Sequence, residues 1–202
     1  MLISFESIVK KYGKPNGILH CGGNIGEEAQ AYDSQGVKDV CWIEANPELI
    51  PTLKANVKQY GHKVVESCVS DMEGFEVVFH ISNNAGQSSS FLELGTHKIQ
   101  HPSVHYVKDI TMKTRRLDSM GCWGGYDFLN LDLQGSELKA MRGLGEYLHN
   151  FKLIYCEVNK AAVYVDCPHV NDIDLFLNGF GFKRVETAKW IGDWTDAIYI
   201  KK

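Results

Sequence analysis

The stretch ILHCGGNIGEE, residues 18–28, decides the fold of this 202-residue chain. An apolar run ends at Cys21, glycines follow at positions 22, 23 and 26, and two acids come next. A glycine-rich turn between a strand and a helix is typical of α/β proteins that bind nucleotides. The stretch therefore predicts a strand, a ligand-binding turn and a helix, and it leaves open which nucleotide the turn accepts.

The residues around the turn disfavour a phosphate ligand. A dinucleotide fingerprint that ends at Gly26 would need glycine where Cys21 stands, and a P-loop would need lysine where Glu27 stands. Carboxylates beside the first turn of a helix repel the phosphates that helix N-termini otherwise bind. S-adenosylmethionine carries a sulfonium, an ammonium and a carboxylate on a nucleoside, and it has no phosphate. It is therefore the ligand that these residues favour.

Composition limits the classes of protein that the chain can represent. Hydrophobic residues make up 44% and charged residues 23%, values typical of a globular domain, and the net charge is −4. No basic block suggests nucleic-acid binding, and no apolar run approaches the roughly 20 residues of a membrane span. The N-terminus carries Glu6 within its apolar part and has no small-residue cleavage site, so it does not resemble a secretory signal.

The cysteines predict a reducing compartment. None of them forms a C-x-x-C pair, so free thiols in a cytoplasmic protein are expected rather than disulfides or a zinc site. The six are Cys21, Cys41, Cys68, Cys122, Cys156 and Cys167.

Strands and helices alternate along the first third of the chain. Strands are expected over residues 16–21, 39–45 and 63–71, and helices over 27–36 and 46–61. In the second helix we expect Asn46 as the N-cap, Pro47 at the first helical position and Gly61 as the stop. This β-α-β-α-β order is the repeating unit of a doubly wound parallel sheet.

The alternation is then interrupted and resumes later. A long polar loop, 83–106, separates two extra strands, 74–82 and 107–118, and a loop of that length is usually functional. The predicted elements that follow are strands at 126–135 and 151–159, helices at 136–148 and 170–181, and a hairpin of 182–190 with 196–202. The predicted fold class is α/β, a doubly wound, mostly parallel seven-stranded sheet with an inserted strand and long loop.

We expect a single domain, 1–202, in three parts. Residues 17–73 are the predicted cofactor-binding half, 74–125 the insertion that carries the substrate loop, and 126–202 the second half.

The strand ends define the predicted cofactor site, because ligands of open α/β sheets lie beyond the carboxyl ends of the strands. Glu44 can accept hydrogen bonds from both ribose hydroxyls, and Asp71 can accept one from the adenine amino group. The glycines allow close approach of the backbone, and N–H groups at the helix start are expected to hold the carboxylate of the ligand. The expected cofactor-binding residues are Gly22, Gly23, Asn24, Gly26, Glu44, Ala45, Ser70 and Asp71.

With these residues assembled, the chain resembles the FkbM family of S-adenosylmethionine-dependent methyltransferases, from about Ile18 to the C-terminus. The segment around Asp132 is the most telling, because that family commonly has an acid after an apolar strand, then an acid or amide, glycine and glutamate. Two departures are His20 with Cys21, where many methyltransferases have an acid, and Gln134, often glutamate. The stretches that carry the resemblance are HCGGNIGEE (20–28), WIEANPELIPTLKANV (42–57), VSDMEG (69–74), TRRLDSM (114–120), NLDLQGSELKAMRG (130–143) and YCEVN (155–159).

The resemblance implies methyl transfer, usually to a hydroxyl oxygen of a sugar or another small molecule. A hydroxyl is a weak nucleophile near neutral pH, so a general base or a metal should assist it. Asp132, His97 and Glu157 are the expected catalytic residues, although Asp132 can instead cap the following turn. The expected substrate-binding residues are Gln87, Ser88, Glu137 and Asn159, and Glu137 can instead be a stabilising acid in the first turn of a helix.

The histidines of the long loop invite a metal-site hypothesis. His97, His101 and His105 are spaced four apart, which on a continuous helix would place them on one face. Pro102 makes such a helix unfavourable, so no metal site is predicted. The loop is expected to cover the acceptor, and Tyr164, among other aromatic residues, can stack on a sugar ring or pack in the core.

Two other functions remain open from the sequence. An NAD-linked oxidoreductase shares the fold and the acid at position 44 but would need the missing glycine fingerprint. A binding module that has lost catalysis is favoured by the departures at His20 and Cys21. A small-molecule or glycan acceptor is the expected partner, and no nucleic acid is expected.

Overall fold

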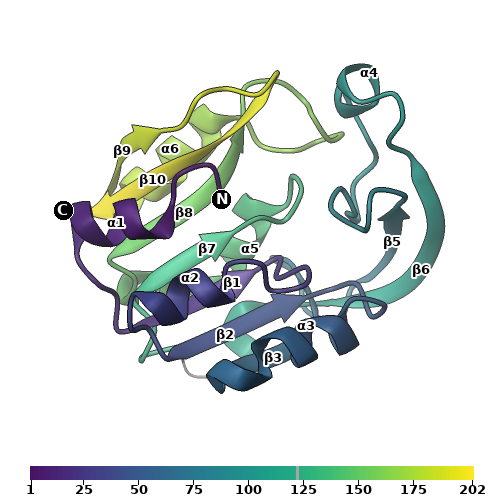
Figure 1. Ribbon diagram of the computed structural model, residues 1–202. Coiled ribbons are helices and arrows are strands. Elements are labelled where there is room, and N and C mark those ends of the chain that lie inside the picture. Colours follow the sequence, from purple (N-terminus) through teal and green to yellow (C-terminus); the bar gives the residue numbers. More distant parts are fainter. Residues whose placement is uncertain (122) are drawn as a thin grey trace.

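The computed structural model describes residues 1–121 and 123–202, and a seven-stranded sheet forms its centre (Figure 1). The strand order is β3-β2-β1-β7-β8-β10-β9, and every neighbouring pair is parallel except those that involve β10. This confirms the predicted fold class. The strands are β1 Gly17–Cys21, β2 Asp39–Glu44, β3 Lys63–Glu66, β7 Phe128–Leu131, β8 Leu153–Asn159, β9 Phe182–Thr187 and β10 Trp194–Lys201.

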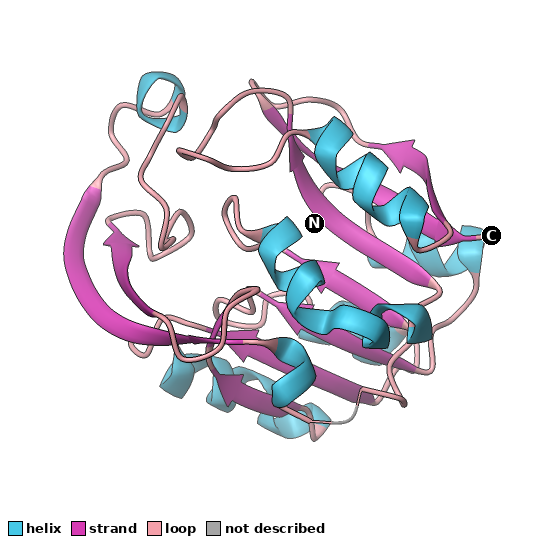
Figure 2. Cartoon of the chain, turned by 180° about the vertical axis from the view of Figure 1, so that it is seen from behind, coloured by secondary structure: helices cyan, strands magenta, loops and turns pink. Residues whose placement is uncertain are grey.

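Helices cover both faces of the sheet (Figures 1 and 2). Successive side chains of a strand point to opposite faces, so Ile18 packs with one set of helices and Leu19 with the other. One face buries α1 (Phe5–Tyr12), α2 (Ala29–Ser34) and α3 (Ile50–Val57), and the other buries α5 (Glu137–Leu144) and α6 (Val170–Gly179). No helix in the described part of the chain is long and apolar enough to cross a membrane.

β1 occupies the point where the winding of the sheet reverses. It pairs with β2 on one side and with β7 on the other, so the connections that follow these strands run in opposite directions. A crevice opens at such a switch point, beyond the carboxyl ends of the strands. The glycine turn at 22–26 begins there, which is why the chain presents it to a ligand.

The inserted region forms a second sheet of its own. β6 (Tyr106–Arg115) pairs in parallel with β4 (Cys68–Val69) and antiparallel with β5 (Glu76–Ser82). Figure 1 shows the long β6 curving away from the central sheet. The loop between β5 and β6 contains only the short helix α4 (His97–Gln100).

The predicted single strand 63–71 is wrong, because it breaks at Ser67. β3 pairs with β2 as far as Glu66, and the Ser67 N–H then donates to the Glu44 carbonyl at 2.9 Å. The chain next pairs with the inserted β6, where Ser70 N–H donates to Arg115 O at 2.9 Å. Both halves are apolar and β-branched, so the pattern carried no sign that they belong to different sheets.

The predicted helix 46–61 also begins later than expected. The Asn46 side chain accepts from Glu48 N–H at 3.0 Å and closes a turn, and α3 then starts at Ile50 with Pro51, not Pro47, in its first turn. A short 3₁₀ turn, Lys58–Tyr60, carries the helix to Gly61, whose φ of 73° ends it as predicted. The expected helix 27–36 is similarly shorter, running from Ala29 to Ser34.

The helix predicted at 136–148 ends at Leu144. The packing of Gly143 explains why a glycine occurs within it. A Cβ at Gly143 would lie 2.2 Å from Ser70 O, so only glycine lets α5 pack against the segment that joins the two sheets. A 3₁₀ segment, Gly145–Asn150, follows it. The strand predicted at 126–135 is shorter, β7 ending at Leu131, and the other strands and α6 lie within three residues of their predicted bounds, whereas α1 was not predicted.

The five described cysteines are free and buried, as predicted. Cys122 lies outside the described residues.

Candidate functional site

The glycine turn is shaped by protein packing as much as by any ligand. Gly22 has a φ of 88°, and a Cβ there would lie 1.7 Å from Asp132 O, because the turn passes directly over the end of β7. A Cβ at Gly26 would lie within 3 Å of Leu53 and Val57 of α3. Gly22 therefore lets β1 and β7 end side by side at the crevice, while Gly26 seats the turn on a helix.

Glu44, at the end of β2, holds the turn from below. Its Oε2 accepts from Asn24 N–H at 2.8 Å and its Oε1 from Asn46 N–H at 2.7 Å. Burial raises the pKa of this carboxyl group, and the backbone donors act in the opposite direction by favouring the charged form. The remaining lone pairs of both oxygens are available to hydroxyl donors from the crevice.

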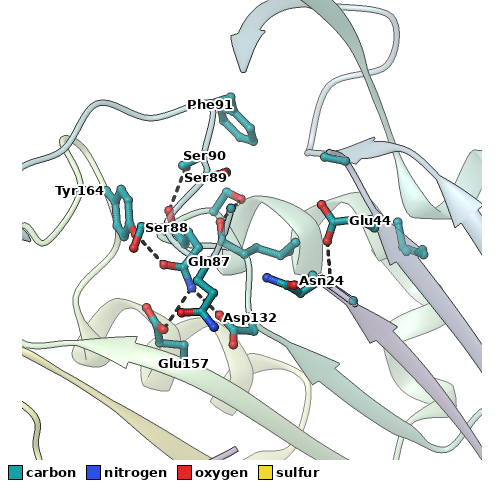
Figure 3. Close-up of a pocket in the computed structure, with 18 of the residues that line it drawn as sticks. Asn24, Glu44, Gln87, Ser88, Ser89, Ser90, Phe91, Asp132, Glu157 and Tyr164 are labelled. Atoms are coloured by element: carbon teal, nitrogen blue, oxygen red, sulfur yellow. Dashed lines mark hydrogen bonds between the residues drawn. The ribbon is translucent and has the colours of Figure 1, made fainter. Parts of the chain in front are cut away.

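A cavity of about 440 Å³ lies over these strand ends, within the range of small-molecule sites (Figure 3). Figure 3 shows Asn24 and Glu44 on one side of it and Asp132, Glu157 and Tyr164 on the other. In the described chain no lysine or arginine lines the cavity, whereas six acids do. These acids are Glu27, Glu28, Glu44, Asp132, Glu157 and Asp196.

Most of the site residues expected from the sequence meet in this cavity, and five of them do not. Those that line it are Gly22, Gly23, Asn24, Glu44, Ala45, Gln87, Ser88, His97, Asp132 and Glu157. Those outside its described wall are Gly26, Ser70, Asp71, Glu137 and Asn159.

Asp71 lies outside the described cavity wall and makes its contacts with neighbouring protein groups. Its carboxylate accepts from Ser70 Oγ at 3.1 Å, and its carbonyl accepts from Arg116 Nη1 at 3.0 Å. Because the predicted third strand breaks at Ser67, the residues that reach the cavity from this segment are Ser67, Cys68 and Val69.

A polar cluster surrounds Asp132 at the end of β7. Gln134 has a positive φ of 52°, which turns its amide back so that Nε2 donates to Asp132 Oδ1 and lies 3.4 Å from Glu157 Oε2. Tyr164 donates its hydroxyl to Gln134 Oε1. A non-glycine residue with a positive φ is strained, and such strain persists where neighbouring groups hold the residue in place. Here those groups are the Asp132 and Glu157 carboxyl groups and the Tyr164 hydroxyl.

The carboxyl groups of this cluster ionise with difficulty. Asp132 is open to the cavity yet enclosed by protein on its other sides, and this desolvation, with Asp196 and Glu137 nearby, raises its pKa to about 7. Burial and Asp132 raise the pKa of Glu157 well above its usual range. Near neutral pH, Asp132 can therefore both accept and release a proton.

Glu137 is a supporting residue of the same loop. It is fully buried at the start of α5, and its Oε1 accepts from Leu133 N–H at 2.8 Å and Gly135 N–H at 3.2 Å. Its Oε2 has no partner among the described residues. Burial raises the pKa of Glu137 to about 7. This side chain lies outside the described cavity wall and fixes the turn that carries Asp132 and Gln134.

The loop 83–106 covers the cavity, and His97 anchors it. His97 Nε2 lies 3.1 Å from Ser88 Oγ, which also accepts from Asn84 Nδ2 at 2.9 Å. His97 Nδ1 is buried and has no partner among the described residues. Burial, with His101 next in importance, lowers the pKa of His97, so the ring is neutral.

The three histidines of the loop do not converge on one point. α4 ends at Gln100, His101 follows it with its ring 4.9 Å from that of His97, and His105 is exposed with Nδ1 near Ser103 O. The described residues contain no group of three or more side chains able to hold a metal ion.

Several residues of the site could not be found from the sequence. For Tyr164 the sequence left stacking or core packing open, and its hydrogen bond to Gln134 from a fully buried position was not predicted. Phe79, Phe91 and Asp196 come from distant segments, and no local pattern marks them. Gly135 indicates a tight turn at this point, but it does not predict that Gln134 also has a positive φ.

Comparison with known proteins agrees with this geometry. A family model described as "Methyltransferase FkbM domain" matches residues 20–184. No curated protein gives a significant match.

Solved structures resemble the fold. A ribosomal-protein methylase from Lactobacillus delbrueckii subsp. bulgaricus is 14% identical, with a TM-score of 0.55 over 98% of this chain and 77% of that one. A 1,6-didemethyltoxoflavin-N1-methyltransferase from Burkholderia thailandensis, with S-adenosylhomocysteine bound, is 10% identical, with a TM-score of 0.52 over 97% and 75%. At these identities the likeness extends to the fold alone.

Proposed function

The chain belongs to the FkbM methyltransferase domain family, whose cofactor is S-adenosylmethionine, and we propose that it methylates a hydroxyl group of an uncharged polar small molecule, such as a sugar or glycan. The chemistry of the cavity supports this acceptor class. The carrying observation is that the described wall contains six acids with amides and hydroxyls but no lysine or arginine, and that its Met1 ammonium is paired with Glu28.

The cavity fits the cofactor. The turn at Gly22 and Gly23 lines the cavity, and the Glu44 carboxylate belongs to the same wall. Glu44 would accept from the ribose hydroxyls, Ala45 and Cys68 would border the adenine, and the acids around Asp132 would balance the positive charges of the ligand. The cofactor supplies an electrophilic methyl group on its sulfonium.

The protein must then align a hydroxyl group and accept its proton. Asp132, whose pKa near 7 matches the operating pH, is the proposed general base. The Gln134 side-chain amide contacts both Asp132 and Glu157 and so holds Asp132 in place. His97 is neutral and lies across the cavity on the covering loop, so it is the alternative base or an acceptor contact.

The charge of the cavity argues against anionic acceptors. A phosphate group entering it would meet six acids and no described lysine or arginine. Desolvated like charges within a few ångströms repel strongly, so phosphorylated sugars and nucleic acids are poor candidates. An uncharged polyol can replace its hydrogen bonds to water with hydrogen bonds to the hydroxyl, amide and carboxylate groups of the wall.

The test is transfer of a radiolabelled methyl group from S-adenosylmethionine to a panel of neutral sugars, phosphorylated sugars, amines and RNA. The expected result is label on a neutral polyol, with the new bond identified as an O-methyl ether by NMR. The matched control is the same sugar without the hydroxyl concerned, which should not be labelled. Methylation of RNA, a phosphorylated sugar or a nitrogen atom in place of the hydroxyl would overturn the proposal.

A further inference from the structure

His20 is a buried histidine beneath the glycine turn with one ring nitrogen left for a ligand. It is 3% exposed and belongs to the cavity wall. Its ring stacks on Trp42, with centroids 4.4 Å apart, and its Nδ1 faces Tyr32 and Asn130. In the described chain no protein group is hydrogen-bonded to Nε2.

Hydrogen bonds on the inner side of the ring fix its tautomer. Asn130 Nδ2 donates to the Tyr32 hydroxyl at 2.8 Å and also lies 3.4 Å from His20 Nδ1. The Tyr32 hydroxyl lies 3.1 Å from Nδ1 and donates a hydrogen bond to it. Among the described residues, the other acceptor within reach of this hydroxyl is the weak Met1 sulfur at 3.9 Å. Nδ1 is thus an acceptor, and the ring hydrogen is on Nε2.

The ring stays neutral in the pH range of most assays. Burial is the largest cause that lowers the pKa of His20 to about 4, and it outweighs the opposing effect of Glu28, with the Met1 ammonium acting alongside burial. A neutral imidazole of this tautomer offers one N–H donor to the cavity at all pH values above about 5.

Four backbone donors of the turn are already used. Gly22 and Gly23 donate to Ile43 O at 2.8 and 3.0 Å, Asn24 donates to Glu44, and Gly26 donates to Gly23 O. These four amides are therefore not free to bind the ligand carboxylate. The described cavity wall holds no lysine or arginine, and the Met1 ammonium in it is paired with Glu28 Oε1 at 3.4 Å.

We propose that His20 Nε2–H donates a hydrogen bond to the carboxylate of the methionine part of S-adenosylmethionine. Asp132 and Asp196, which lie near the same Met1 ammonium that Glu28 pairs with, are then the acids that face the ammonium group of the ligand. His20 is a positioning residue: it orients the methionine arm and with it the sulfonium. The inference concerns the cofactor alone and does not depend on which acceptor is methylated.

Calorimetry with ligands that differ only in the methionine arm tests this role. The ligands are S-adenosylhomocysteine, decarboxylated S-adenosylmethionine, which keeps the ammonium, and 5′-methylthioadenosine, which lacks both groups. His20→Ala should weaken binding of S-adenosylhomocysteine about tenfold or more, as for a lost hydrogen bond to a charged group, and leave the other two within about twofold. The matched control is His62→Ala, which removes a histidine on the far edge of Trp42, outside the cavity wall.

Other outcomes overturn the proposal in distinguishable ways. Equal weakening of all three ligands assigns His20 a structural role, and weakening of the two charged ligands alone assigns its effect to the ammonium site. Unchanged binding removes it from the site.

A spectroscopic readout on the wild-type protein does not depend on any variant that folds poorly. Nitrogen-15 NMR of the ligand-free protein should report a neutral His20 ring protonated at Nε2 from about pH 5.5 to 8, and a change in the Nε2 signal on addition of S-adenosylhomocysteine but not of 5′-methylthioadenosine. A ring protonated at Nδ1, or at both nitrogens, would refute the tautomer on which the proposal depends.

Discussion

Asp132 is the residue on which the proposed chemistry depends. It is the first residue beyond β7, and its carbonyl lies against Gly22 while its carboxylate faces the cavity. Gln134 and the enclosing protein hold it there, and nearby acids keep its proton affinity high. A carboxylate in this state is a better base toward a hydroxyl group than one in free solution, because its pKa is closer to the pH of the reaction.

Replacing Asp132 by Asn removes the base and keeps the shape. Methyl transfer should fall about 100-fold or more, the usual contribution of a positioned base. Binding of S-adenosylhomocysteine, measured by calorimetry, separates catalysis from cofactor binding. Asp71→Asn is the control, since Asp71 lies outside the described cavity wall and should leave both quantities unchanged. Undiminished transfer by Asp132→Asn would exclude Asp132 from the reaction, and a loss of cofactor affinity alone would make it a binding residue.

The pH profile distinguishes Asp132 from His97 as the base. A base must be deprotonated, so a carboxyl group with a pKa of about 7 gives a rate that rises between pH 6 and 8. Burial and His101 lower the pKa of His97, so a rate that depended on its deprotonation would rise at lower pH and be closer to level over that range. Steady-state rates at saturating cofactor should therefore rise through pH 7, and a level profile would favour His97.

Glu44 is expected to serve structure and cofactor together. Glu44→Gln places an amide N–H₂ where one oxygen now accepts a backbone N–H, which should lower the free energy of unfolding by about 1–3 kcal/mol. Affinity for S-adenosylhomocysteine should fall about tenfold, because charge-assisted hydrogen bonds are lost. Glu66→Gln is the matched control: Glu66 pairs with Glu44 in the sheet register but is exposed at the end of β3. Equal cofactor affinity of the two variants would contradict the assigned role.

Among the elements, α5 connects the central sheet to the insertion. Its Gly143 touches the carbonyl of Ser70, and its first residue, Glu137, holds the turn that carries Asp132. The helix therefore sets the distance between β7 and the second sheet, and so the width of the cavity.

Gly143→Ala tests this packing. The added methyl group would meet the Ser70 carbonyl at 2.2 Å, so the helix must shift and the free energy of unfolding should fall by about 1–3 kcal/mol. Gly179→Ala, near the end of α6, meets nothing within 4 Å and should be neutral or stabilising by up to about 1 kcal/mol. Urea unfolding of both variants measures the difference. Equal stability of the two would mean that α5 does not approach Ser70 as closely as the structure has it.

Glu137 makes the stability of the ligand-free protein depend on pH. Its pKa is about 7 in the folded protein against 4.5 as the ordinary value, so between these values the folded state binds more protons than the unfolded chain. The free energy of unfolding should therefore fall as the pH rises from 5 to 8, by at most about 3 kcal/mol from this group.

Glu137→Gln should flatten that dependence in urea unfolding, because its carbonyl still accepts from Leu133 and Gly135 but it cannot ionise. Glu146→Gln, which removes an exposed acid just beyond the same helix, should retain the wild-type slope. Identical slopes in the two variants would show that Glu137 does not titrate as described.

Local patterns identified the elements of the central sheet but not how the insertion folds. The strands that end at Cys21 and Glu44 were predictable because their apolar runs stop at glycine or at an acid, whereas β7 was predicted but its end at Leu131 was not. The break at Ser67 and the position of Asp71 were not, because pairing with β6 is a contact over more than 40 residues. The polar cluster at Gln134 and Tyr164 depends on similar long-range contacts. The proposed roles of Asp132, Glu157 and His97 stay predictions.

At the scale of the whole molecule, the cavity lies between the central sheet and the insertion, with the loop 83–106 over it. Gly22 comes from the predicted cofactor half, Ser88 from the insertion and Asp132 from the second half, so all three segments contribute to its wall. That division of the chain stays a prediction. The shared wall suggests that cofactor and acceptor occupy neighbouring parts of one space, as in-line methyl transfer requires.

The most direct test of this account is a calorimetric titration of the purified protein with S-adenosylmethionine, S-adenosylhomocysteine and NAD. The glycine turn, Glu44 and the acidic cavity wall predict micromolar binding of the first two and no binding of NAD, whose pyrophosphate would meet the acids of that wall. Binding of NAD, or silence from both S-adenosyl ligands, would contradict the account.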